Sequence, residues 1–543
     1  MPLRFLVSLT RLLLVAAGFP PAFILAETKP DQRHVVVVVW DGMRPDFISE
    51  RNTPTLWKLS REGVTFRHHH SIYPTMTYVN GAAMATGAYP NRNGLLANRE
   101  FRPQIDSQRF FETADPEIIK KGDEVTGGKY LALPTVAEIV RGAGRRAVTV
   151  GTKSVAFLHD RRADWNTTAA KSFTGKFYAA PMPPNLREEA LRFLGSLSSD
   201  PAETIDANTA ATRVMTGVLW REDLPAYSLL WLSEPDQTQH DHSPGAEPSL
   251  VAIRGSDRNL ATVLDALAKK NARDTTDVFV VSDHGFSTIE RGLDFPRELR
   301  AAGFDAVDAF AEAPKAGQIM VVGDAGTILF YIIGHDRAVA ARLVEWLQRS
   351  DFAGVVFSHE EFEGAFPLET VNTNTINAPD VMVALRWNPK PNKFGVAGQI
   401  ITDATRGAGQ GSHATLSEFD VHNTLVATGP NFRRGMSNEL PSSNVDLAPT
   451  VLHLLGIESP AKFDGRVLSE AMTGESAKPP NAVTQTLEFT RKFSSGQWRQ
   501  HLRLSRVGES VYFDEGNGAF EASTSTSTSS ASSATPASPP APK

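Results

Sequence analysis

The segment HVVVVVW, residues 34–40, constrains the fold of this chain more than any other stretch. Its β-branched residues follow one another without polar interruption, which is typical of a strand buried on both faces of a parallel sheet. The run ends at Asp41, which is followed by a glycine. The chain is therefore expected to contain a sheet that is covered on both sides by helices.

Similar apolar runs recur at residues 146–151, 227–233 and 276–282. Stretches with helical apolar spacing separate the strands, including LPTVAEIVRGAG (133–144) and RNLATVLDALAKKN (258–271). This alternation predicts an α/β fold with a doubly wound sheet. Residues from about 290 to 400 are less regular, and we interpret them as a smaller inserted cap of strands and helices.

The two ends of the chain differ in composition from the middle. Residues 1–26 place Arg4 and Arg11 ahead of an apolar run that ends at Ala26, a pattern typical of a secretory signal peptide. A retained membrane anchor is the alternative, although a Pro-Pro pair interrupts the run. We expect export to the periplasm or the medium, with no stable membrane span after cleavage. Residues 516–543 are rich in Ser, Thr, Ala and Pro, which predicts a disordered tail.

Composition excludes several classes of function. The chain contains no cysteine, so an exported fold must be stable without disulfides, and any metal ion must be bound by nitrogen and oxygen ligands. The formal net charge of -6 argues against nucleic-acid binding through bulk positive charge. We therefore expect no nucleic-acid partner, and the sequence predicts no particular oligomeric state.

Acidic residues follow three of the predicted strands. They are Asp41 after the first run, Asp236 after residues 227–233, and Asp283 after residues 276–282. Ligands of a doubly wound sheet bind beyond the carboxyl ends of the strands, because loops and helix N-termini converge there. A single Asp at a strand end is most often a helix cap. Three of them, two with histidines close by, indicate a shared function at one edge of the sheet.

The segment SEPDQTQHDHSPG has a spacing that suits a metal ion. Asp236 and His240 are four residues apart, which places both side chains on one face of a helical turn. One oxygen and one nitrogen can then reach the same ion. The spacing alone is a weak signal, because Asp241 and His242 offer competing pairs.

Two further segments contribute histidines. Asp283 and His284 are adjacent in VVSDHGF, where Gly285 allows the chain to turn so that both side chains converge. His413 lies among glycines in GAGQGSHATLSEFD. Together with Asp41, Asp236 and His240, these groups supply three carboxylates and three imidazoles, which are enough for two divalent cations with vacant positions for a substrate. Nitrogen and oxygen ligands without thiolate favour zinc, with manganese as an alternative.

Six segments of the chain occur in a characteristic order: VVVWDGMRPD, YPTMTYVNGAAMATGAYPNRNG, EPDQTQH, SDHGF, GSHATLSEFD and NVDLAPTVLHLLGI. Over residues 34–475 the sequence resembles the alkaline phosphatase superfamily, and within it the nucleotide pyrophosphatase/phosphodiesterase branch. The resemblance implies an α/β/α sandwich around a mostly parallel sheet, with an inserted smaller cap subdomain. It further implies one catalytic domain over residues 27–515, with the cap at about 290–400.

The resemblance also implies a role for each candidate ligand. One ion would be bound by Asp41, Thr77, Asp283 and His284, and the other by Asp236, His240 and His413. A threonine alcohol is a poor nucleophile at neutral pH and needs a partner that lowers its pKa. Of the two threonines in SIYPTMTYVN, the resemblance selects Thr77 over Thr75 as the nucleophile that forms a phosphothreonine intermediate. Asn98 would donate to a nonbridging phosphoryl oxygen.

Substrate choice depends on the residues around the two metals. A phosphate monoester carries nearly two negative charges, whereas a diester carries one and needs room for a second substituent. Relatives that cleave monoesters tend to have a lysine and an arginine two residues apart, but here Lys153 is followed by Val155. Lys153 is a candidate phosphate contact, with Arg161 or Arg162 as alternative cations. Tyr78 directly follows Thr77, at the position where nucleotide-cleaving relatives have an aromatic residue that stacks on the base. Packing in the core is the alternative role for Tyr78.

The sequence thus predicts an exported two-zinc hydrolase of phosphodiester or pyrophosphate bonds, with a small phosphate ester or nucleotide as its substrate. A phosphomonoesterase or phosphonate hydrolase acting on the same site is the nearest alternative. A non-catalytic exported binding protein is a more distant one, because a degenerate member should lack ligands and all seven are present here.

Overall fold

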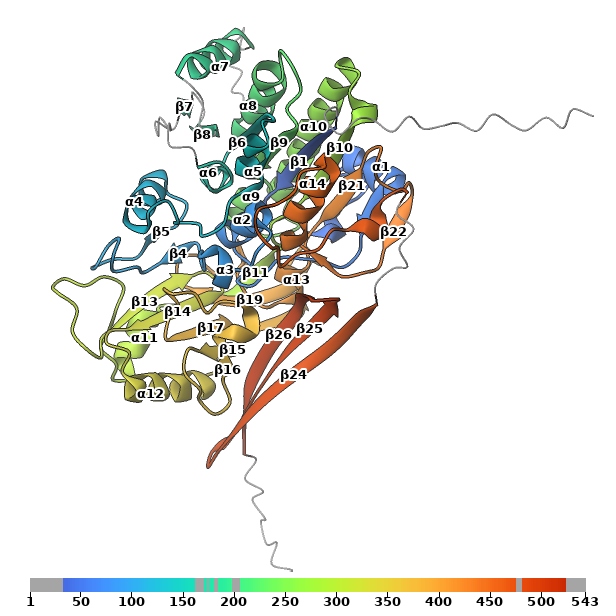
Figure 1. Cartoon of the computed structure of the whole chain (residues 1–543). Coiled ribbons are helices and arrows are strands. Elements are labelled where there is room, and N and C mark those ends of the chain that lie inside the picture. Colours follow the sequence, from blue (N-terminus) through green and yellow to red (C-terminus); the bar gives the residue numbers. More distant parts are fainter. Residues whose placement is uncertain are drawn as a thin grey trace, which may run out of the picture.

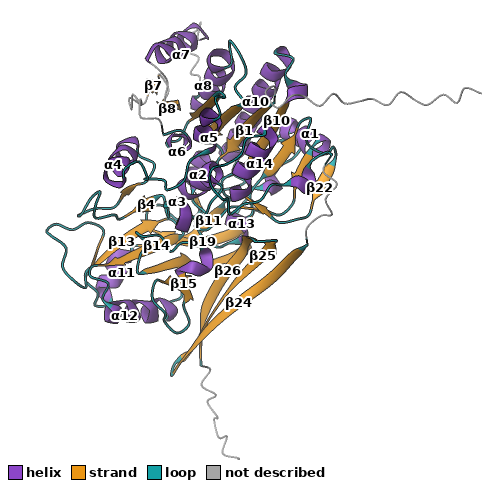
Figure 2. Ribbon diagram, viewed as in Figure 1, coloured by secondary structure: helices purple, strands orange, loops and turns teal. Residues whose placement is uncertain are grey.

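The computed structural model describes residues 33–161, 170–172, 175–179, 184–197, 206–474 and 481–523. A large sheet surrounded by helices fills the upper half of Figure 1, and smaller sheets lie below it. Figure 2 shows the same division by secondary structure, with helices on both sides of the large sheet. The predicted signal peptide, residues 1–26, lies outside the described residues.

The large sheet has nine strands in the order β22-β2-β21-β10-β1-β9-β6-β8-β7. Its centre consists of the four strands that the sequence predicts: β10 (Thr276–Val281), β1 (His34–Trp40), β9 (Tyr227–Leu232) and β6 (Ala147–Gly151). These four are mutually parallel, with Val38 of β1 paired with Val280 on one side and Leu230 on the other. The flanking strands are β2 (Val64–Phe66), β7 (Ala170–Ser172), β8 (Gly175–Ala179), β21 (Leu425–Thr428) and β22 (Met436–Asn438). Strands β21 and β8 pair antiparallel with this centre, so the sheet as a whole is mixed.

The valines of β1 alternate between two hydrophobic cores. Val35, Val37 and Val39 face a core that includes helices α2 (Thr77–Thr86), α5 (Val136–Gly142) and α14 (Leu447–Leu455). Val36 and Val38 face a second core, with helices α1 (Pro54–Glu62), α8 (Ala207–Val214) and α10 (Glu247–Lys269). Both faces of the strand are therefore covered. This explains the continuous apolar run and confirms the α/β/α sandwich.

The region interpreted as an inserted cap contains a six-stranded sheet in the order β12-β13-β14-β17-β15-β16. Its strands are β12 (Ala306–Val307), β13 (Ile319–Asp324), β14 (Thr327–Ile332), β15 (Ala353–Ser358), β16 (Phe366–Pro367) and β17 (Val381–Leu385). Helices α11 (Phe295–Ala301) and α12 (Arg337–Gln348) share a core with these strands. A second sheet, ordered β18-β19-β11-β20, begins soon after β10 with β11 (Ser287–Leu293) and contains β18 (Trp387–Pro391), β19 (Ala397–Asp403) and β20 (Gly411–Ser412).

The C-terminal part of the described chain forms a separate antiparallel sheet of β24 (Ala482–Phe493), β25 (Gly496–Val507) and β26 (Ser510–Ala522). The predicted start of the tail at residue 516 is therefore wrong, because β26 continues to Ala522. Backbone contacts order these polar residues: Gly516 N–H donates to Leu416 O at 2.9 Å while β26 pairs with β25. Residues 524–543 lie outside the described part of the chain.

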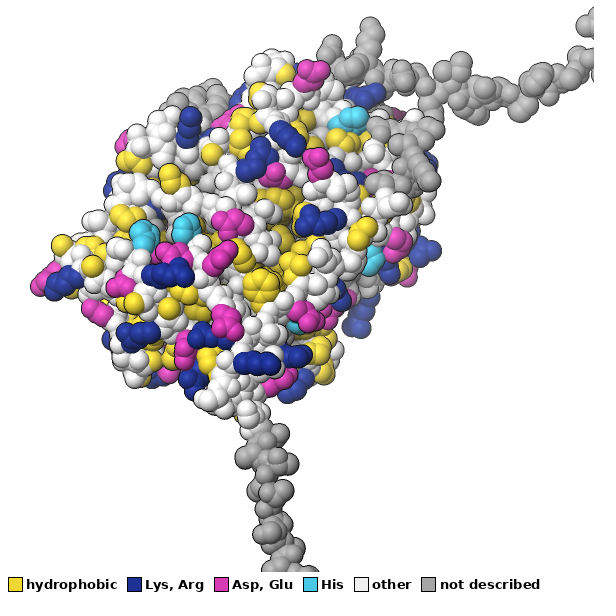
Figure 3. Space-filling model, turned by 60° about the horizontal axis from the view of Figure 1, so that its bottom comes forward, with side chains coloured by type: hydrophobic (Ala, Val, Ile, Leu, Met, Phe, Trp, Pro, Cys, Tyr) yellow, Lys and Arg dark blue, Asp and Glu magenta, His cyan; other side chains and the backbone are white. Residues whose placement is uncertain are grey.

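Shorter elements occupy the connections: β3 (His69–His70), α3 (Pro90–Asn93), β4 (Arg99–Glu100), β5 (Phe111–Glu112), α4 (Pro116–Thr126), α6 (Ala156–His159), α7 (Pro184–Leu197), α9 (Asp236–His242), α13 (Glu418–Val421) and β23 (Ser442–Ser443). Within the described ranges, none of the helices combines the length and the apolar content that a membrane crossing requires. On the face shown in Figure 3, basic and acidic side chains are interspersed.

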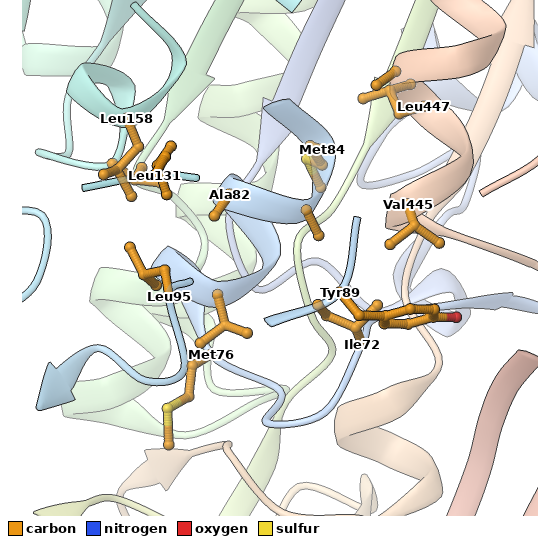
Figure 4. Packing of buried hydrophobic residues seen from close by; sticks show 14 of the residues in the cluster. Ile72, Met76, Ala82, Met84, Tyr89, Leu95, Leu131, Leu158, Val445 and Leu447 are labelled. Atoms are coloured by element: carbon orange, nitrogen blue, oxygen red, sulfur yellow. The ribbon is translucent and has the colours of Figure 1, made fainter. Parts of the chain in front are cut away.

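Helix α2 lies inside the first core, and its first residue is Thr77, the predicted nucleophile. Figure 4 shows the buried side chains around this helix, with Leu131 and Leu158 on one side and Val445 and Leu447 on the other. Nearly every residue of α2 is buried. Packing from several directions therefore fixes the position of the helix and of its first turn.

The close packing of α2 predicts that Gly81→Ala destabilises the protein. A Cβ atom at Gly81 would lie 2.2 Å from Val155 Cγ2, so a buried side chain would have to move. Overpacking of this kind costs about 1–3 kcal/mol. Gly255→Ala in α10 is the matched control, because its nearest atom, on Arg258, is 3.6 Å away and alanine favours a helix by up to about 1 kcal/mol. Thermal unfolding should show a lower apparent Tm for the first variant only, and equal values for both would contradict this packing.

Candidate metal centre

Three carboxylates meet where neighbouring strands of the large sheet end. Asp41 directly follows β1, Asp236 begins α9 after β9, and Asp283 lies two residues beyond β10. All three are buried, and the strands are adjacent in the order β10-β1-β9. Main-chain bonds connect them, since Asp236 N–H donates to Asp41 O at 2.9 Å and Gly42 N–H donates to Asp283 Oδ1 at 3.0 Å. The structure thus brings the three predicted acidic residues to one edge.

Helix α9 brings the four-residue pair together. His240 Nε2 lies 3.3 Å from Asp236 Oδ1, one turn away on the same helix face. The other ring nitrogen, Nδ1, lies 3.0 Å from Gly411 O. His242, the competing histidine of this segment, is exposed. The helical phase therefore distinguishes between the two histidines, which the spacing alone does not.

Asp283 and His284 also converge. His284 Nε2 lies 3.3 Å from Asp283 Oδ2 and 3.6 Å from Asp41 Oδ1. From the sequence, Gly285 is expected here for the conformational freedom that a turn needs. The structure shows a different reason for that glycine, since a Cβ atom there would lie 2.1 Å from Phe419 O. A close approach of two backbones requires the missing side chain.

His413 joins the group from a loop that is distant in sequence. Its ring stacks on that of His284, with centroids 3.6 Å apart and an angle of 16° between the planes. His413 Nε2 lies 3.5 Å from Asp236 Oδ1, and its Nδ1 lies 2.7 Å from Thr75 O. The main chain of the predicted nucleophile loop therefore orients this imidazole.

The three imidazoles have the same orientation relative to the main chain. Each places Nδ1 within hydrogen-bond distance of a carbonyl oxygen, that of Gly411, Gly285 or Thr75. A carbonyl only accepts, so each Nδ1 is the protonated nitrogen and each Nε2 of a neutral ring carries a lone pair. These lone pairs face carboxylate oxygens of Asp41, Asp236 and Asp283. Among the described residues, Asp236 Oδ1 and Asp283 Oδ2 have no hydrogen-bond partner, and Asp41 Oδ1 lies 3.0 Å from the Lys153 ammonium. Lone pairs on both sides of one space fit a cation between them.

The ligand atoms fall into two overlapping groups. Asp41, Asp283 and His284 form one, and Asp236, His284 and His413 form the other, with the atoms of each group within 4.8 Å of one another. The first matches three of the ligands that the resemblance implies for one ion. The second contains His284 where the resemblance implies His240. His240 lies beside this group, with its ring centroid 5.2 Å from that of His413.

Charge and burial shift the pKa values of these groups in different directions. Burial raises the pKa of Asp41, and the nearby charge of Asp283 adds to the effect. Burial acts the same way on Asp236, but the nearby charge of Lys153 outweighs it and holds the pKa of Asp236 well below its usual range. Burial also lowers the pKa of His413, with His284 adding to the shift, which favours the neutral ring that can bind a metal.

Thr77 and Thr75 have different environments. Thr77 Oγ1 lies 3.3 Å from His284 Nε2, at the N-terminus of α2, where the helix dipole favours negative charge. Thr75 Oγ1 instead donates to Thr415 O at 2.8 Å. The hydroxyl of Thr75 is thus used to connect two loops, whereas that of Thr77 faces the carboxylate and imidazole cluster. This difference agrees with the choice of Thr77 from the sequence.

The predicted substrate contacts surround Thr77. Asn98 Oδ1 accepts from Tyr78 N–H at 2.7 Å, and the Tyr78 hydroxyl accepts from Ser154 Oγ at 3.1 Å. Tyr78 is half-buried and packs against the first core, which is the alternative role considered for it. Burial raises its pKa to about 12, with Glu112 adding to the shift, so its hydroxyl is neutral.

Lys153 lies inside the carboxylate cluster. Its Nζ is 2.5 Å from Asp236 Oδ2 and 3.0 Å from Asp41 Oδ1. These charges outweigh the effect of burial and raise the pKa of Lys153, so the ammonium form persists. Arg161, considered as an alternative phosphate contact, instead pairs with Asp123 and Glu138, and its neighbour at position 162 lies outside the described residues.

Two residues that hold this centre were not predicted from the sequence. Trp231 Nε1–H donates to Asp41 Oδ2 at 2.8 Å from the adjacent strand. Asp420 accepts from Ser287 Oγ and from Thr415 Oγ1, both at 2.6 Å, and Thr415 in turn accepts the hydroxyl of Thr75 through its carbonyl. In the sequence, Trp231 looks like an ordinary apolar core residue of β9. Its bond to Asp41 could be predicted only from the strand register, which places Trp231 opposite Val39.

Known proteins resemble this chain along most of its length. The family described as type I phosphodiesterase/nucleotide pyrophosphatase matches residues 35–387. Human ectonucleotide pyrophosphatase/phosphodiesterase family member 7 is 22% identical over 526 residues, which cover 94% of this chain and 98% of that protein. Human family member 5 is 24% identical over 466 residues, 83% of this chain and 79% of that protein. A venom phosphodiesterase of Naja atra is 21% identical over 296 residues, 53% of this chain and 30% of that protein.

A solved structure shows the same fold. Murine ectonucleotide pyrophosphatase/phosphodiesterase 5, an inactive variant in complex with AMP, superimposes with a TM-score of 0.57 at 17% identity. The alignment covers 81% of this chain and all of that structure. The motif order, the fold and the family match agree. The chain therefore belongs to the type I phosphodiesterase/nucleotide pyrophosphatase family of metal-dependent hydrolases.

Proposed function

We propose that this protein hydrolyses phosphodiester or pyrophosphate bonds of nucleotides with two bound divalent metal ions and Thr77 as the nucleophile. The observation that carries the proposal is the position of Thr77. Its hydroxyl lies 3.3 Å from His284 Nε2, at the edge of a buried cluster in which Asp236 Oδ1 and Asp283 Oδ2 have no hydrogen-bond partner within the described part of the chain. A hydroxyl in this place is suited to attack a phosphorus atom bound beside it.

The metal ligands would divide as the family resemblance implies. One ion would be held by Asp41, Thr77, Asp283 and His284, and the other by Asp236, His240 and His413. Imidazole and carboxylate ligands without thiolate favour zinc at both positions. When bound, the cations would lower the pKa of the threonine alcohol and of a water molecule and would neutralise charge on the phosphoryl oxygens.

The residues of the chain account for the remaining requirements. Thr77 Oγ forms a bond to phosphorus while the bond to the leaving-group oxygen breaks, which gives a phosphothreonine. The N-terminus of α2 favours the negative charge of the transferred group. Water then breaks the new bond and restores the Thr77 hydroxyl. Asn98 donates to a nonbridging oxygen through the amide NH2 group that its bond to Tyr78 leaves available.

The basic side chains near the proposed metal ions favour a phosphodiester as the substrate. Lys153 is the only cationic Lys or Arg side chain of the described residues with an ion pair to these carboxylates, and buried Val155 stands where monoesterases have an arginine. A diester carries one negative charge and needs fewer cationic partners than a monoester. Tyr78 would then stack on a base, a contact that contributes about 1–3 kcal/mol. A phosphomonoesterase or phosphonate hydrolase on the same site is the second candidate, and Lys153 is the feature that favours it.

The cellular location and the domain limits complete the proposal. Residues 1–26 would direct export and be removed, leaving residues from 27 onward as the catalytic domain with a cap at about 290–400. The similarity to venom phosphodiesterases and to ectoenzymes supports a periplasmic or secreted protein.

The first prediction concerns the nucleophile. Thr77→Ala removes the attacking oxygen and should lower kcat by on the order of a thousandfold or more, as for other nucleophile deletions. Thr77→Ser keeps a hydroxyl at the same helix N-terminus and should retain measurable turnover. Mass spectrometry of acid-quenched reactions should find one phosphoryl group on the peptide of residue 77 in wild type and none in the alanine variant. Unchanged turnover of Thr77→Ala would mean that another group attacks.

The second prediction concerns the ligands. Purified protein should contain two divalent cations per chain, and chelation should abolish activity until zinc is returned. His240→Ala should lower metal affinity by at least about tenfold, the cost of disturbing a metal site. His242→Ala is the matched control on the same helix, because its side chain is exposed. Elemental analysis measures the metal content, and metal titration measures the affinity of each variant. Equal metal content and affinity in the two variants would exclude His240 as a ligand.

The third prediction concerns the substrate. Bis-p-nitrophenyl phosphate should be hydrolysed with a kcat/KM at least about tenfold above that of p-nitrophenyl phosphate, a difference of about 1.4 kcal/mol in transition-state stabilisation. Both compounds release the same leaving group, so the comparison isolates the second substituent and the charge. A large preference for the monoester would favour the phosphomonoesterase instead.

A further inference from the structure

The amide of Asn98 has a fixed orientation. Its oxygen accepts the N–H of Tyr78, the residue after Thr77, at 2.7 Å. Only the oxygen of an amide accepts, so the NH2 group points to the other side. The direction of this group therefore depends on the position of the Asn98 backbone relative to α2.

The segment before Asn98 is held by residues close in sequence. Glu100 Oε1 accepts from Leu96 N–H at 2.7 Å and from Ala97 N–H at 3.2 Å. Arg102 Nε donates to Glu100 Oε2 at 2.7 Å, so the buried Glu100 carboxylate is charge-paired. These contacts belong to one loop. The carbonyl of the peptide that follows Asn98 accepts from Thr113 N–H at 2.8 Å and from Thr113 Oγ1 at 3.1 Å, so the N–H of that peptide, on Arg99, still needs an acceptor.

Asp324 supports that peptide from a distant part of the chain. Its Oδ2 accepts from Arg99 N–H at 2.9 Å, across 225 residues of sequence. Asp324 is the last residue of β13, in the six-stranded sheet of the cap region. The cap region thus contacts the main chain directly after Asn98, the proposed hydrogen-bond donor to a phosphoryl oxygen.

The surroundings of Asp324 make a purely stabilising role unfavourable. Its side chain is 7% exposed, and burial raises the pKa of its carboxyl to about 8, with Arg99 opposing and Glu112 adding to the shift. One accepted main-chain bond offsets only part of the cost of burying a carboxyl group. A carboxyl here is better explained by what it positions.

The turn after Asp324 contacts a second part of the site. Gly326 N–H donates to His413 O at 3.1 Å, and Thr327 Oγ1 donates to Ala414 O at 2.5 Å. A Cβ atom at Gly326 would lie 2.8 Å from His413 O, so the turn and the loop lie in close contact. One hairpin tip of the cap therefore contacts both the Asn98 segment and the loop of a proposed metal ligand.

We propose that Asp324 is a positioning residue that sets the direction of the Asn98 amide through the Arg99 peptide N–H. The inference rests on the donor role that the proposed function gives to Asn98. Without the carboxyl, the Arg99 N–H loses its acceptor, and the peptide is held only through its carbonyl, by Thr113. The peptide can then rotate about that contact and turn the Asn98 side chain away from Thr77. A misplacement of about 1 Å in an active site can cost about a hundredfold in rate.

A double-mutant cycle tests the proposal in the full-length, metal-loaded protein with bis-p-nitrophenyl phosphate. Asp324→Ala should lower kcat by about tenfold to a hundredfold with little change in KM, because the lost interaction acts in the transition state. Asp324→Asn should keep most of the activity, since its amide oxygen accepts the same N–H. Asn98→Ala combined with Asp324→Ala should be no slower than Asn98→Ala alone, because the carboxyl acts through the amide.

Asp380→Ala is the matched control, because Asp380 is a buried carboxyl beside the same sheet that accepts Ile332 N–H at 2.6 Å, away from Asn98. It should lower the Tm without changing kcat. If Asp324→Ala does not fold, Asp324→Ser replaces it with the same expected result. Additive losses in the double variant, or wild-type kcat in Asp324→Ala, would overturn the inference. Full activity of Asn98→Ala would instead refute the donor role itself, so the two failures are distinguishable.

Discussion

Three carboxylates buried at one edge of a sheet are the constraint on which the rest of this structure depends. Asp41, Asp236 and Asp283 are at most 1% exposed. An unbalanced charge in such a place costs several kcal/mol. Within the described residues, a single ammonium group forms ion pairs with them. Parallel strands place these residues together, and carboxyl groups that one ammonium leaves uncompensated agree with the metal dependence of the family.

The main chain, more than the side chains, shapes the centre around that charge. Carbonyl oxygens from three separate segments orient the imidazoles, and one of these carbonyls belongs to Thr75 in the loop of the proposed nucleophile. Gly285 allows a backbone to approach where any side chain would collide. The positions of Thr77 and His413 are therefore coupled through Thr75, and the cap adds a further contact at Gly326. The geometry results from how loops of distant segments pack on one sheet edge.

The sequence predicted those features that leave a recognisable pattern of neighbouring residues. The valine run predicted β1, strand and helix alternation predicted the sandwich, and motif order predicted the family. Residues that act through a single distant bond left no pattern, as with Trp231 on Asp41 and Asp324 on the Arg99 peptide. The end of β26 was missed for a related reason: its polar and glycine-rich residues are ordered by pairing with β25, and composition does not record a pairing partner.

In the proposed function, Lys153 would connect the charge of the centre with the charge of a substrate. Its ammonium contacts two of the three carboxylates, so it offsets part of a negative charge that cations would otherwise neutralise alone. Carboxylates that bound metal cations would attract the ammonium less strongly, so in the proposed function Lys153 would be able to donate to a phosphoryl oxygen. One such donor, with Val155 rather than a second cation beside it, matches a substrate of single negative charge. The same balance of charges that would hold the metals is thus the reason for proposing a diester as the substrate.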